Sequence, residues 1–542
     1  MQGSWQTKEQ LVKLLTKLVE HASITGSQGE IALGKYLYYL LKEQKYFKKN
    51  PDFLQLHPVN NGRSFVTALV KQGDTNETVV LLNHFDVVDV TDYGDLTSLS
   101  FQPLKLTNVL KARSSQLPEQ VREDLESGEW LFGRGTMDMK AGLAVQLTMV
   151  ERAINGDFKG NLLLVSVPDE EVNSAGMISA VPVLDELKQR FGLTYKACIN
   201  SEPMFAKYPE DQNYYIYTGS IGKVLASFYC SGIETHAGEP FSGLNANLLL
   251  SELNRLLELN PDFCEQEGVE ISPPPTSLKM KDLKEEYSVQ IPHTSISMYN
   301  MFIMNGSISD LHCKLLQVVK EAALNVEEFY KKRSQHYHKL ISFSPLDLKV
   351  KVLTFMELLQ IAKKKYGEKA IERRIRELLL KSGAEDERDL STRIVAELAG
   401  LCKEYGAMIV LFYSPPYYPS VSSKGNAMIQ KTVEYMTAYA EANYQIELKQ
   451  QNYFPGLCDL SFVQLNDNGK AVSQLTANMP LYGNGYSLPL SEMQRLNIPI
   501  LNIGPVGRDP HKWTERLHIP YAFEILPELL SIAIKTIFEG EK

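Results

Sequence analysis

The first 200 residues alternate between β-branched apolar runs and segments with helical periodicity, which leaves few folds open. The apolar runs cover residues 79–87, 161–171 and 197–203, and the helical segments between them cover residues 137–156 and 175–192. The order strand, helix, strand, helix, strand predicts an open, largely parallel α/β sheet. Ligands bind beyond the carboxyl ends of the strands in such sheets, so polar residues at those ends are candidates for a functional site.

The pattern changes at about Tyr215. An extended stretch, a helix (245–259), a strand (288–304) and a long helix (308–333) follow in an order that predicts a smaller α+β domain. Residues 353–405 then predict three helices, and the α/β pattern resumes after Asn426 and ends with a strand at 499–504. The expected organisation is a main α/β domain in two parts, residues 1–214 and 415–542. The smaller domain is expected at 215–414, with a helical insertion at about 335–405.

The composition excludes several classes of protein. The 56 basic and 65 acidic side chains give a net charge of −9, which argues against a nucleic-acid binder. No apolar run reaches the 18 residues of a membrane span, and the amphipathic N-terminus lacks the features of a signal peptide. None of the six cysteines forms a CxxC pair. Thinly spread thiols of this kind are typical of a cytoplasmic protein. With no membrane span in the sequence, no membrane partner is expected.

Several polar residues follow the predicted strands, and each has an ordinary structural explanation when taken alone. His84 and Asp86 lie two apart at a strand end, where they commonly form a hydrogen-bonded pair. Asp138 lies in the glycine-flanked stretch GRGTMDMKAG before a helix and would serve equally as an N-cap. Glu170 and Glu171 in PDEE would ordinarily be solvated surface charges.

Taken together, these residues indicate a metal site. Five possible ligands all follow predicted strands of one sheet: His84, Asp138, Glu171, Glu202 and His511. Two imidazoles and three carboxylates suit zinc or a similar divalent metal, and one carboxylate can bridge a pair of ions. The sequence contains no GxSxG, HExxH, P-loop or helix-opening GxGxxG motif, so competing chemistries have little support.

Six motifs in this order resemble one family. HFD, GRGTMDMKAG, PDEE, SEP, THAGEPFSGLNAN and GRDPHKWTE resemble the dinuclear zinc hydrolases that include acetylornithine deacetylase, succinyl-diaminopimelate desuccinylase, aminoacylase and related carboxypeptidases and dipeptidases. The length and the middle insertion look most like the RocB-type arginine-utilisation proteins. The resemblance implies a largely parallel-sheet catalytic domain with an inserted α+β lid and dimerisation domain, and hence a possible homodimer.

The resemblance also implies a role for each motif residue. His84 and Glu202 would hold one divalent ion and Glu171 and His511 the other, with zinc as the favoured metal, while Asp138 would bridge the two. Asp86 would orient the site, and Glu170 would act as general base and then general acid. His236 would stabilise the oxyanion, with Gly243 and Asn245 in the substrate-binding loop after it. The resemblance further implies a cis peptide bond between Asp138 and Met139.

Two departures from the family pattern concern the substrate. Family members that bind a substrate carboxylate often carry an arginine on the lid strand before the last long helix, where this chain aligns Phe302. The helical insertion at 335–405 is absent from the shorter members. Within the family, a glutamate at the Glu202 position is commoner among deacylases and desuccinylases, and an aspartate among dipeptidases.

The resulting prediction is a two-metal enzyme that hydrolyses an amide bond in a small N-acyl amino acid or peptide-like substrate. The resemblance to the RocB-type proteins suggests a place in arginine or ornithine metabolism. A dipeptidase or carboxypeptidase of the same family is the first alternative. The second is a non-catalytic, metal-dependent metabolite-binding protein. All seven positions expected to carry the metals and the proton transfer are intact, which disfavours this second alternative.

Overall fold

A computed structural model describes residues 5–208, 211–381, 383, 385–465 and 470–540. These residues form two compact units. Unit 1 lies within Met1–Ile221, Val421–Asn466 and Pro489–Lys542, and unit 2 lies within Gly222–Ser420 and Asp467–Leu488. None of the helices in these described residues combines the length and the apolar character that crossing a membrane requires.

Unit 1 contains an eight-stranded sheet in the order β1-β2-β5-β3-β6-β18-β7-β17. The strands are β1 (Leu54–Pro58), β2 (Ser64–Val70), β3 (Glu77–His84), β5 (Asn161–Val167), β6 (Thr194–Asn200), β7 (Tyr214–Tyr217), β17 (Leu448–Gln451) and β18 (Ile500–Asn502). The expected α/β class is confirmed, but the sheet is mixed. The four central strands β5, β3, β6 and β18 are mutually parallel, whereas β1–β2, β2–β5 and β18–β7 pair antiparallel.

Helices cover the sheet of unit 1, and the central strand β5 is buried along its whole length. The helices are α1 (Lys8–Glu20), α2 (Gln28–Lys42), α3 (Lys45–Lys49), α6 (Lys140–Ile154), α7 (Ala175–Phe191), α13 (Ala427–Tyr444), α15 (Leu490–Leu496) and α16 (Leu526–Glu539). Strands buried on both faces are typical of a sheet enclosed between helices. Helix α7 accommodates Pro182 and ends at Gly192, which adopts the left-handed conformation, as the sequence predicts.

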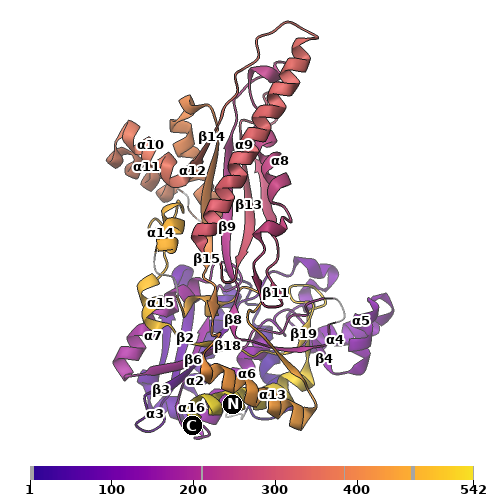
Figure 1. Cartoon of the computed structure of the whole chain (residues 1–542). Helices are drawn as coiled ribbons and strands as arrows, with labels where there is room; N and C mark the ends of the chain where they lie inside the picture. Colours follow the sequence, from indigo (N-terminus) through magenta and orange to yellow (C-terminus); the bar gives the residue numbers. More distant parts are fainter. Residues whose placement is uncertain (1–4, 209–210, 382, 384, 466–469, 541–542) are drawn as a thin grey trace. The chain divides into compact units, whose positions relative to one another are not determined.

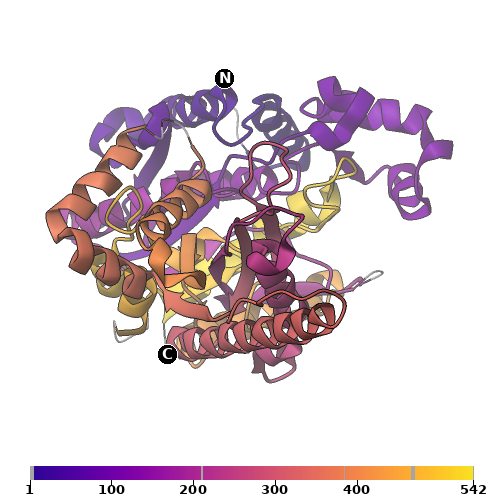
Figure 2. The same ribbon diagram turned by 90° about the horizontal axis from the view of Figure 1, so that it is seen from above.

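A helical segment at residues 91–128 interrupts the path between β3 and α6. It contains the 3-10 turns Thr91–Leu99 and Ser114–Gln116 and the helices α4 (Pro103–Ala112) and α5 (Glu119–Ser127). Its apolar residues form a cluster of their own with β4 (Trp130–Phe132), separate from the main core of unit 1. Strand β4 also pairs with β20 (Arg516–His518), which pairs with β19 (Gly507–Arg508). Figure 1 labels α4, α5, β4 and β19 at one side of unit 1, and α4 and α5 (purple) are again adjacent in Figure 2.

Unit 2 contains a five-stranded sheet in the order β12-β13-β9-β15-β14. The strands are β9 (Gly222–Ser231), β12 (Thr276–Asp282), β13 (Thr294–Ile303), β14 (Val350–Thr354) and β15 (Ala407–Tyr418), and the helices are α8 (Ala246–Leu257), α9 (Ile308–His338), α10 (Phe355–Tyr366), α11 (Glu368–Lys381), α12 (Glu387–Leu401) and α14 (Lys470–Ala477). All twelve residues of β15 are buried, so both faces of this strand, which lies next to the central strand β9, are covered.

The region expected as a purely helical insertion also contains a strand. Residues Val350–Thr354 form β14, which pairs parallel with β15 at one edge of the sheet, and α10, α11 and α12 follow it. Three helices are observed, as predicted, but the strand before them was missed because five apolar and polar residues carry too little periodicity to separate strand from helix. The insertion therefore adds the edge strand β14 to the sheet, and β12 forms the opposite edge. Its helix α12 reaches β12, where Asp389 pairs with Lys279.

Gly504 follows β18 where the chain passes close to Glu202. A Cβ atom at this position would lie 1.7 Å from the backbone oxygen of Glu202. We therefore expect Gly504→Ala to lower the free energy of unfolding by about 1–3 kcal/mol or more, as overpacked core positions do. Urea denaturation checks this result. Gly400→Ala in α12, where nothing lies within 4 Å, is the control that should not destabilise, and an unchanged midpoint for Gly504→Ala would contradict the expectation.

Candidate metal centre

The polar residues predicted from the strand ends gather at the carboxyl edge of the unit 1 sheet. His84 ends β3, Glu202 lies two residues beyond β6, and Asp138 precedes α6. Asp86, Glu170 and Glu171 follow β3 and β5, and His511 lies in the loop between β19 and β20. Parallel neighbouring strands bring their carboxyl ends to the same edge, which explains why segments so far apart in the sequence converge here.

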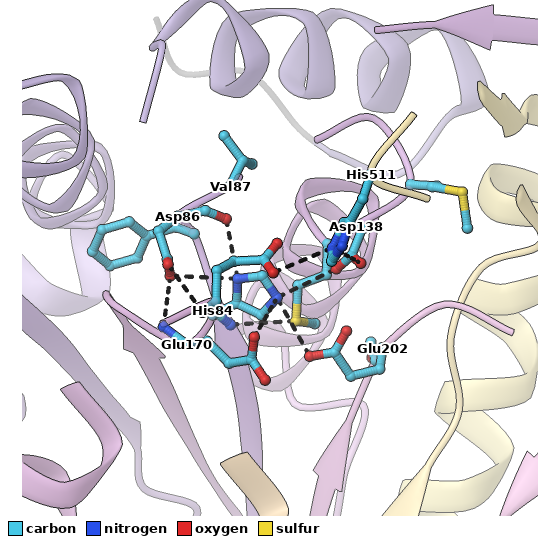
Figure 3. Close-up of polar contacts among 12 residues, drawn as sticks. His84, Asp86, Val87, Asp138, Glu170, Glu202 and His511 are labelled. Carbon is cyan, nitrogen blue, oxygen red and sulfur yellow. Dashed lines mark hydrogen bonds and ion pairs between the residues drawn. The ribbon is translucent and has the colours of Figure 1, made fainter. Parts of the chain in front are cut away.

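Asp138 lies between the two histidines (Figure 3). Its Oδ1 atom is 3.4 Å from Nε2 of His84, and its Oδ2 atom is 3.3 Å from Nε2 of His511. The same His511 nitrogen lies 3.2 Å from Oε2 of Glu171. Each carboxylate oxygen of Asp138 therefore faces a different imidazole, which is the arrangement that a carboxylate bridging two ions requires.

His84 also faces two further carboxylates. Its Nε2 atom is 3.4 Å from Oε1 of Glu202 and 3.8 Å from Oε2 of Glu170. Candidate ligand atoms of His84, Asp138 and Glu171 lie within 4.8 Å of one another, and so do those of His84, Glu170 and Glu202. The site thus offers overlapping sets of nitrogen and oxygen donors, the donor types that zinc and similar divalent metals bind.

Asp86 lies behind this layer of donors. Its carboxylate accepts hydrogen bonds from the backbone N–H groups of Glu170 (3.1 Å) and Glu171 (3.3 Å) and from the hydroxyl of Thr25 (2.8 Å). Its Oδ1 atom lies 3.5 Å from Nδ1 of His84, and its backbone oxygen lies 3.1 Å from the same nitrogen. Asp86 thereby holds the His84 ring with Nε2 directed at the other donors and fixes the turn that presents the two glutamates.

The donor atoms themselves lack protein partners. Nε2 of His84, Oε1 of Glu171 and Oε1 of Glu202 are buried and have no hydrogen-bond partner among the described residues. Buried polar atoms are nearly always satisfied, so three orphans in one place call for a ligand. Two donors about 2.1 Å from one tetrahedral ion are about 3.4 Å apart. The separations of 3.2–3.4 Å between histidine nitrogens and carboxylate oxygens match this value, so the residues fit a bound metal.

The charges at the site agree with that fit. Burial raises the pKa of Glu202 to about 7, with a further rise from the charges of Asp138 and Glu171 against the opposing effect of His84. Burial also raises the pKa of Glu170. Burial alone would lower the pKa of His511, but its bonds and charge interactions with Asp138 and Glu171 raise it to about 11. The excess of buried carboxylates therefore favours any bound positive charge.

Asp138 does not act as a helix cap. The N-cap of α6 is Met139, which makes no side-chain capping bond. The peptide bond between Asp138 and Met139 is cis, as expected. Instead, the loop is held by Glu515, a fully buried residue whose Oε1 accepts from the backbone N–H groups of Met137 (3.3 Å) and Asp138 (3.5 Å) and whose Oε2 accepts from Arg134 (2.8 Å). Burial raises the pKa of Glu515 to about 7, although Arg134 opposes the rise.

Two further acidic residues near the site were not predicted. Asp459 is buried, and neither of its carboxylate oxygens has a hydrogen-bond partner within the described parts of the chain. Burial raises the pKa of Asp459 to about 8 and the charges of Asp86 and Glu202 add to the rise. Asp169 pairs with Arg63 at 2.6 Å. Asp459 follows no predicted strand, so strand-end reasoning had no signal for it, whereas Asp169 adjoins the PDEE glutamates.

The remaining predicted residues lie in unit 2. His236 is exposed, and its Nδ1 atom accepts a hydrogen bond from the backbone N–H of Gly238 at 3.0 Å. A Cβ atom at Gly243 would lie 2.3 Å from the backbone oxygen of Ile233, so this close approach requires glycine. Asn245 is the N-cap of α8, and its side chain accepts from the N–H of Asn247 at 2.9 Å.

Phe302, aligned with the family arginine, lies on β13 opposite Lys223 of β9. The residues of this strand are mostly buried. Phe302 itself is half-buried, and its partner in the strand register is a lysine.

The whole sequence is similar to curated proteins of one family. A model described as peptidase family M20/M25/M40 matches residues 80–473. The protein YqjN of Bacillus subtilis is 54% identical over 536 residues, covering 99% of this chain and 98% of YqjN. Protein RocB of the same organism is 30% identical over 542 residues, covering 96% of this chain and 94% of RocB.

Solved structures share the fold at low sequence identity. The di-peptidase Dug1p of Saccharomyces cerevisiae has a TM-score of 0.56 and 11% identity, with 99% of this chain and 97% of Dug1p covered. The metallo-carboxypeptidase Sso-CP2 of Sulfolobus solfataricus has a TM-score of 0.52 and 12% identity, with 97% and 99% covered. The similarity to these two enzymes lies in the fold of the chain.

Proposed function

The chain belongs to peptidase family M20/M25/M40, and we propose that it is a two-metal hydrolase that cleaves an amide bond in a small N-acyl amino acid or peptide-like compound. Its membership already makes it a metal-dependent hydrolase of amide or peptide bonds. The number of ions, their identity and the substrate are the proposal. The observation that carries it is the position of Asp138, whose two oxygens face Nε2 of His84 and Nε2 of His511.

In this proposal His84 and Glu202 hold one ion, Glu171 and His511 hold the other, and Asp138 bridges them. Zinc is the favoured metal because two imidazoles and three carboxylates match its donor preference. When bound, such ions polarise the scissile carbonyl and lower the pKa of the attacking water. Asp86 acts as the orienting residue, through the bonds to His84 and to the glutamate turn described above.

Glu170 is the proposed general base and acid. Its Oε2 atom lies 3.8 Å from Nε2 of His84, so its carboxylate borders the donor atoms. It takes the proton of the water that attacks the carbonyl carbon and delivers a proton to the amine nitrogen as the C–N bond breaks. The products are a carboxylic acid and an amine.

His236 is the proposed oxyanion donor in unit 2, with Gly243 and Asn245 in the same substrate-binding loop. Its exposed imidazole is available to a substrate carbonyl oxygen. We further propose a homodimer formed through unit 2, in which His236 serves the partner's site. The edge strand β12 supports this proposal: among the described strands it pairs only with β13, and it exposes Leu278 and Met280. The strand of the insertion, β14, lies at the other edge, whereas its helix α12 contacts β12 through the ion pair of Asp389 with Lys279.

A deacylase is the favoured subtype. Residue 202 is a glutamate, which is commoner than aspartate at this position among deacylases and desuccinylases. Similarity to curated relatives named succinyl-diaminopimelate desuccinylase also supports this subtype. One from Buchnera aphidicola is 30% identical over 169 residues, covering 31% of this chain and 38% of that protein. The full-length similarity to RocB supports a place in arginine or ornithine metabolism. All six cysteines are free thiols, which supports a cytoplasmic location.

We expect the purified protein to bind two equivalents of Zn²⁺, measured by elemental analysis after removal of free metal. His511→Ala should bind one equivalent, because it removes a donor that only one of the two ions uses. His57→Gln is the control. His57 on β1 bonds Thr67 on β2, and it is not a proposed ligand, so this variant should still bind two equivalents. A saturated wild-type protein with a single equivalent would rule out the two-metal proposal.

A substrate panel separates the proposed function from its alternatives. N-acyl amino acids, including N-acyl ornithine and N-acyl arginine, should be hydrolysed in preference to dipeptides. Preferred hydrolysis of dipeptides would establish the dipeptidase alternative instead. Full metal content without hydrolysis of either class would favour a non-catalytic metabolite-binding protein.

A further inference from the structure

Two arginines face each other at the base of the hairpin that carries His511. Arg508 on β19 and Arg516 on β20 are direct cross-strand partners, and the loop between them contains His511. Like charges directly opposite each other on paired strands destabilise the pairing. The side chain of Arg516 is fully buried, so solvent cannot screen this repulsion well. The hairpin therefore depends on a counter-charge supplied by another part of the fold.

Asp124 of α5 supplies that counter-charge. Its Oδ1 and Oδ2 atoms lie 2.7 and 2.8 Å from Nη1 of Arg508, and its Oδ2 accepts from Nε of Arg516 at 2.7 Å. The side chain of Asp124 is only 10% exposed. Charge-assisted hydrogen bonds of this length in a buried place are strong, and here one carboxylate holds both strands of the hairpin.

From Arg516 the contacts continue into the loop. Its Nη1 group donates to the backbone oxygen of Thr514 at 3.0 Å and to Oδ2 of Asp509, which also accepts from the hydroxyl of Thr514 at 2.8 Å. Asp509 and His511 have φ angles of 57° and 62°. Residues other than glycine keep this left-handed conformation only where their surroundings hold them in it. The loop conformation thus depends on the bonds that start at Asp124.

The helical segment at residues 91–128 touches the same loop a second time. Trp513 packs against the apolar cluster of that segment, which includes Leu110 and Leu117. The segment also provides Asp92, which bonds Arg134 at 3.0 Å, and Arg134 in turn bonds Glu515. Two direct contacts, and a third that passes through Arg134, therefore connect this segment to the hairpin that presents His511.

We propose that Asp124 is a positioning residue for His511. By holding Arg508 and Arg516 together, it keeps the imidazole directed at the carboxylates of the metal centre and sets the affinity of the metal position that His511 completes. This inference rests on the proposed two-metal function. It adds that the helical segment at residues 91–128 contributes to metal binding, because it holds the hairpin that carries His511.

The test is metal binding by Asp124→Asn, which keeps the size of the side chain but removes its charge. Co²⁺ is titrated into chelator-treated protein and followed by calorimetry and by visible absorption. Asp124 acts on His511 through the hairpin, so one of the two equivalents should bind more weakly, by up to the roughly 10- to 100-fold effect of losing a direct partner of a ligand. The other equivalent should bind as in the wild type. Asp95→Asn is the matched control on the same segment, because Asp95 is exposed and pairs with Arg113, away from the hairpin.

Charge rescue distinguishes positioning from a general loss of stability. In Asp124→Asn combined with Arg508→Gln, the two arginines no longer repel each other, so the affinity of the weakened equivalent should recover in part. A purely structural role would instead weaken both equivalents alike, and the double variant would recover neither of them. That result, or an Asp124→Asn variant that binds both equivalents normally, would overturn the inference.

A second variant keeps the inference testable if Asp124→Asn does not fold. Asp124→Glu keeps the charge but moves the carboxylate by one methylene group relative to its partners Arg508 and Arg516, and it should weaken the same single equivalent by less than loss of the charge would. Unchanged binding by this variant would then overturn the inference. A wild-type protein that binds fewer than two ions would instead contradict the proposed function itself, and the inference with it.

Discussion

Glu170→Gln is expected to lower kcat by about 10²–10⁴-fold, and by more if the same group also protonates the leaving amine. Glutamine has nearly the size of glutamate but cannot accept a proton from the attacking water. The contacts around the residue should survive, because its backbone N–H keeps its bond to Asp86. Hydrolysis of the best substrate of the panel gives the rate, and elemental analysis gives the metal content.

Glu441→Gln on α13 is the matched control, since it makes the same chemical change at an exposed position of unit 1. It should keep full activity and both ions. A Glu170→Gln variant with a nearly native rate and full metal occupancy would remove Glu170 from the proposed mechanism. Loss of rate together with loss of metal would show that Glu170 mainly holds metal and would also contradict the proposed role.

His236→Ala is expected to lower the rate by about 10²–10³-fold, the usual cost of losing one oxyanion donor. Metal content should not change, because His236 belongs to unit 2 whereas every proposed ligand belongs to unit 1. His336→Ala, at an exposed histidine in the last turn of α9, is the matched control and should keep its activity. Wild-type activity in His236→Ala would exclude the oxyanion role.

Mixing two inactive variants tests whether His236 serves the partner subunit. Mixed dimers of His236→Ala and Glu170→Gln contain one site with both residues intact if the histidine acts in trans, so activity should return in part. If mixing restores nothing although labelled subunits demonstrably exchange, His236 acts within its own chain or not at all. The insertion contributes strand β14 at the opposite edge, but its Asp389 pairs with Lys279 on β12. A failure of the subunits to exchange would therefore point to the insertion as an obstacle to this dimer.

The order of strands and helices was predictable because each element carries its own periodicity. The run at 161–171 became β5, and the segment at 137–156 became α6. The candidate ligands were predictable for a related reason: they follow those strands directly, and parallel strands end at a common edge. His511, in a loop after the last strand, required the motif as well.

The remaining features depend on contacts that no local pattern encodes. The antiparallel pairing of β2 with β5 is a choice between neighbours in the folded sheet, because an apolar run fits either direction. The residues around Asp459 and Glu515 come from segments far away in the sequence. Their position beside the metal centre is therefore seen only in the folded structure. Asp124 lies in a charged helical stretch, where an aspartate is normally an exposed residue. Only the pairing of β19 with β20 brings two arginines to it.

The position of β18 in the sheet has a consequence for synthesis of the chain on the ribosome. Its neighbours β6 and β7 are complete once Tyr217 has been made, but β18, which lies between them, is finished only at Asn502. At translation rates of 5–20 residues per second, this gap of about 280 residues lasts roughly 15–60 seconds. The nascent polypeptide must keep an open apolar strand edge at β6 throughout that time, which is the kind of surface that chaperones recognise and that aggregates form on. We therefore expect efficient production of this enzyme in a foreign host to depend on abundant chaperones, because slower synthesis lengthens the time for which this edge stays open.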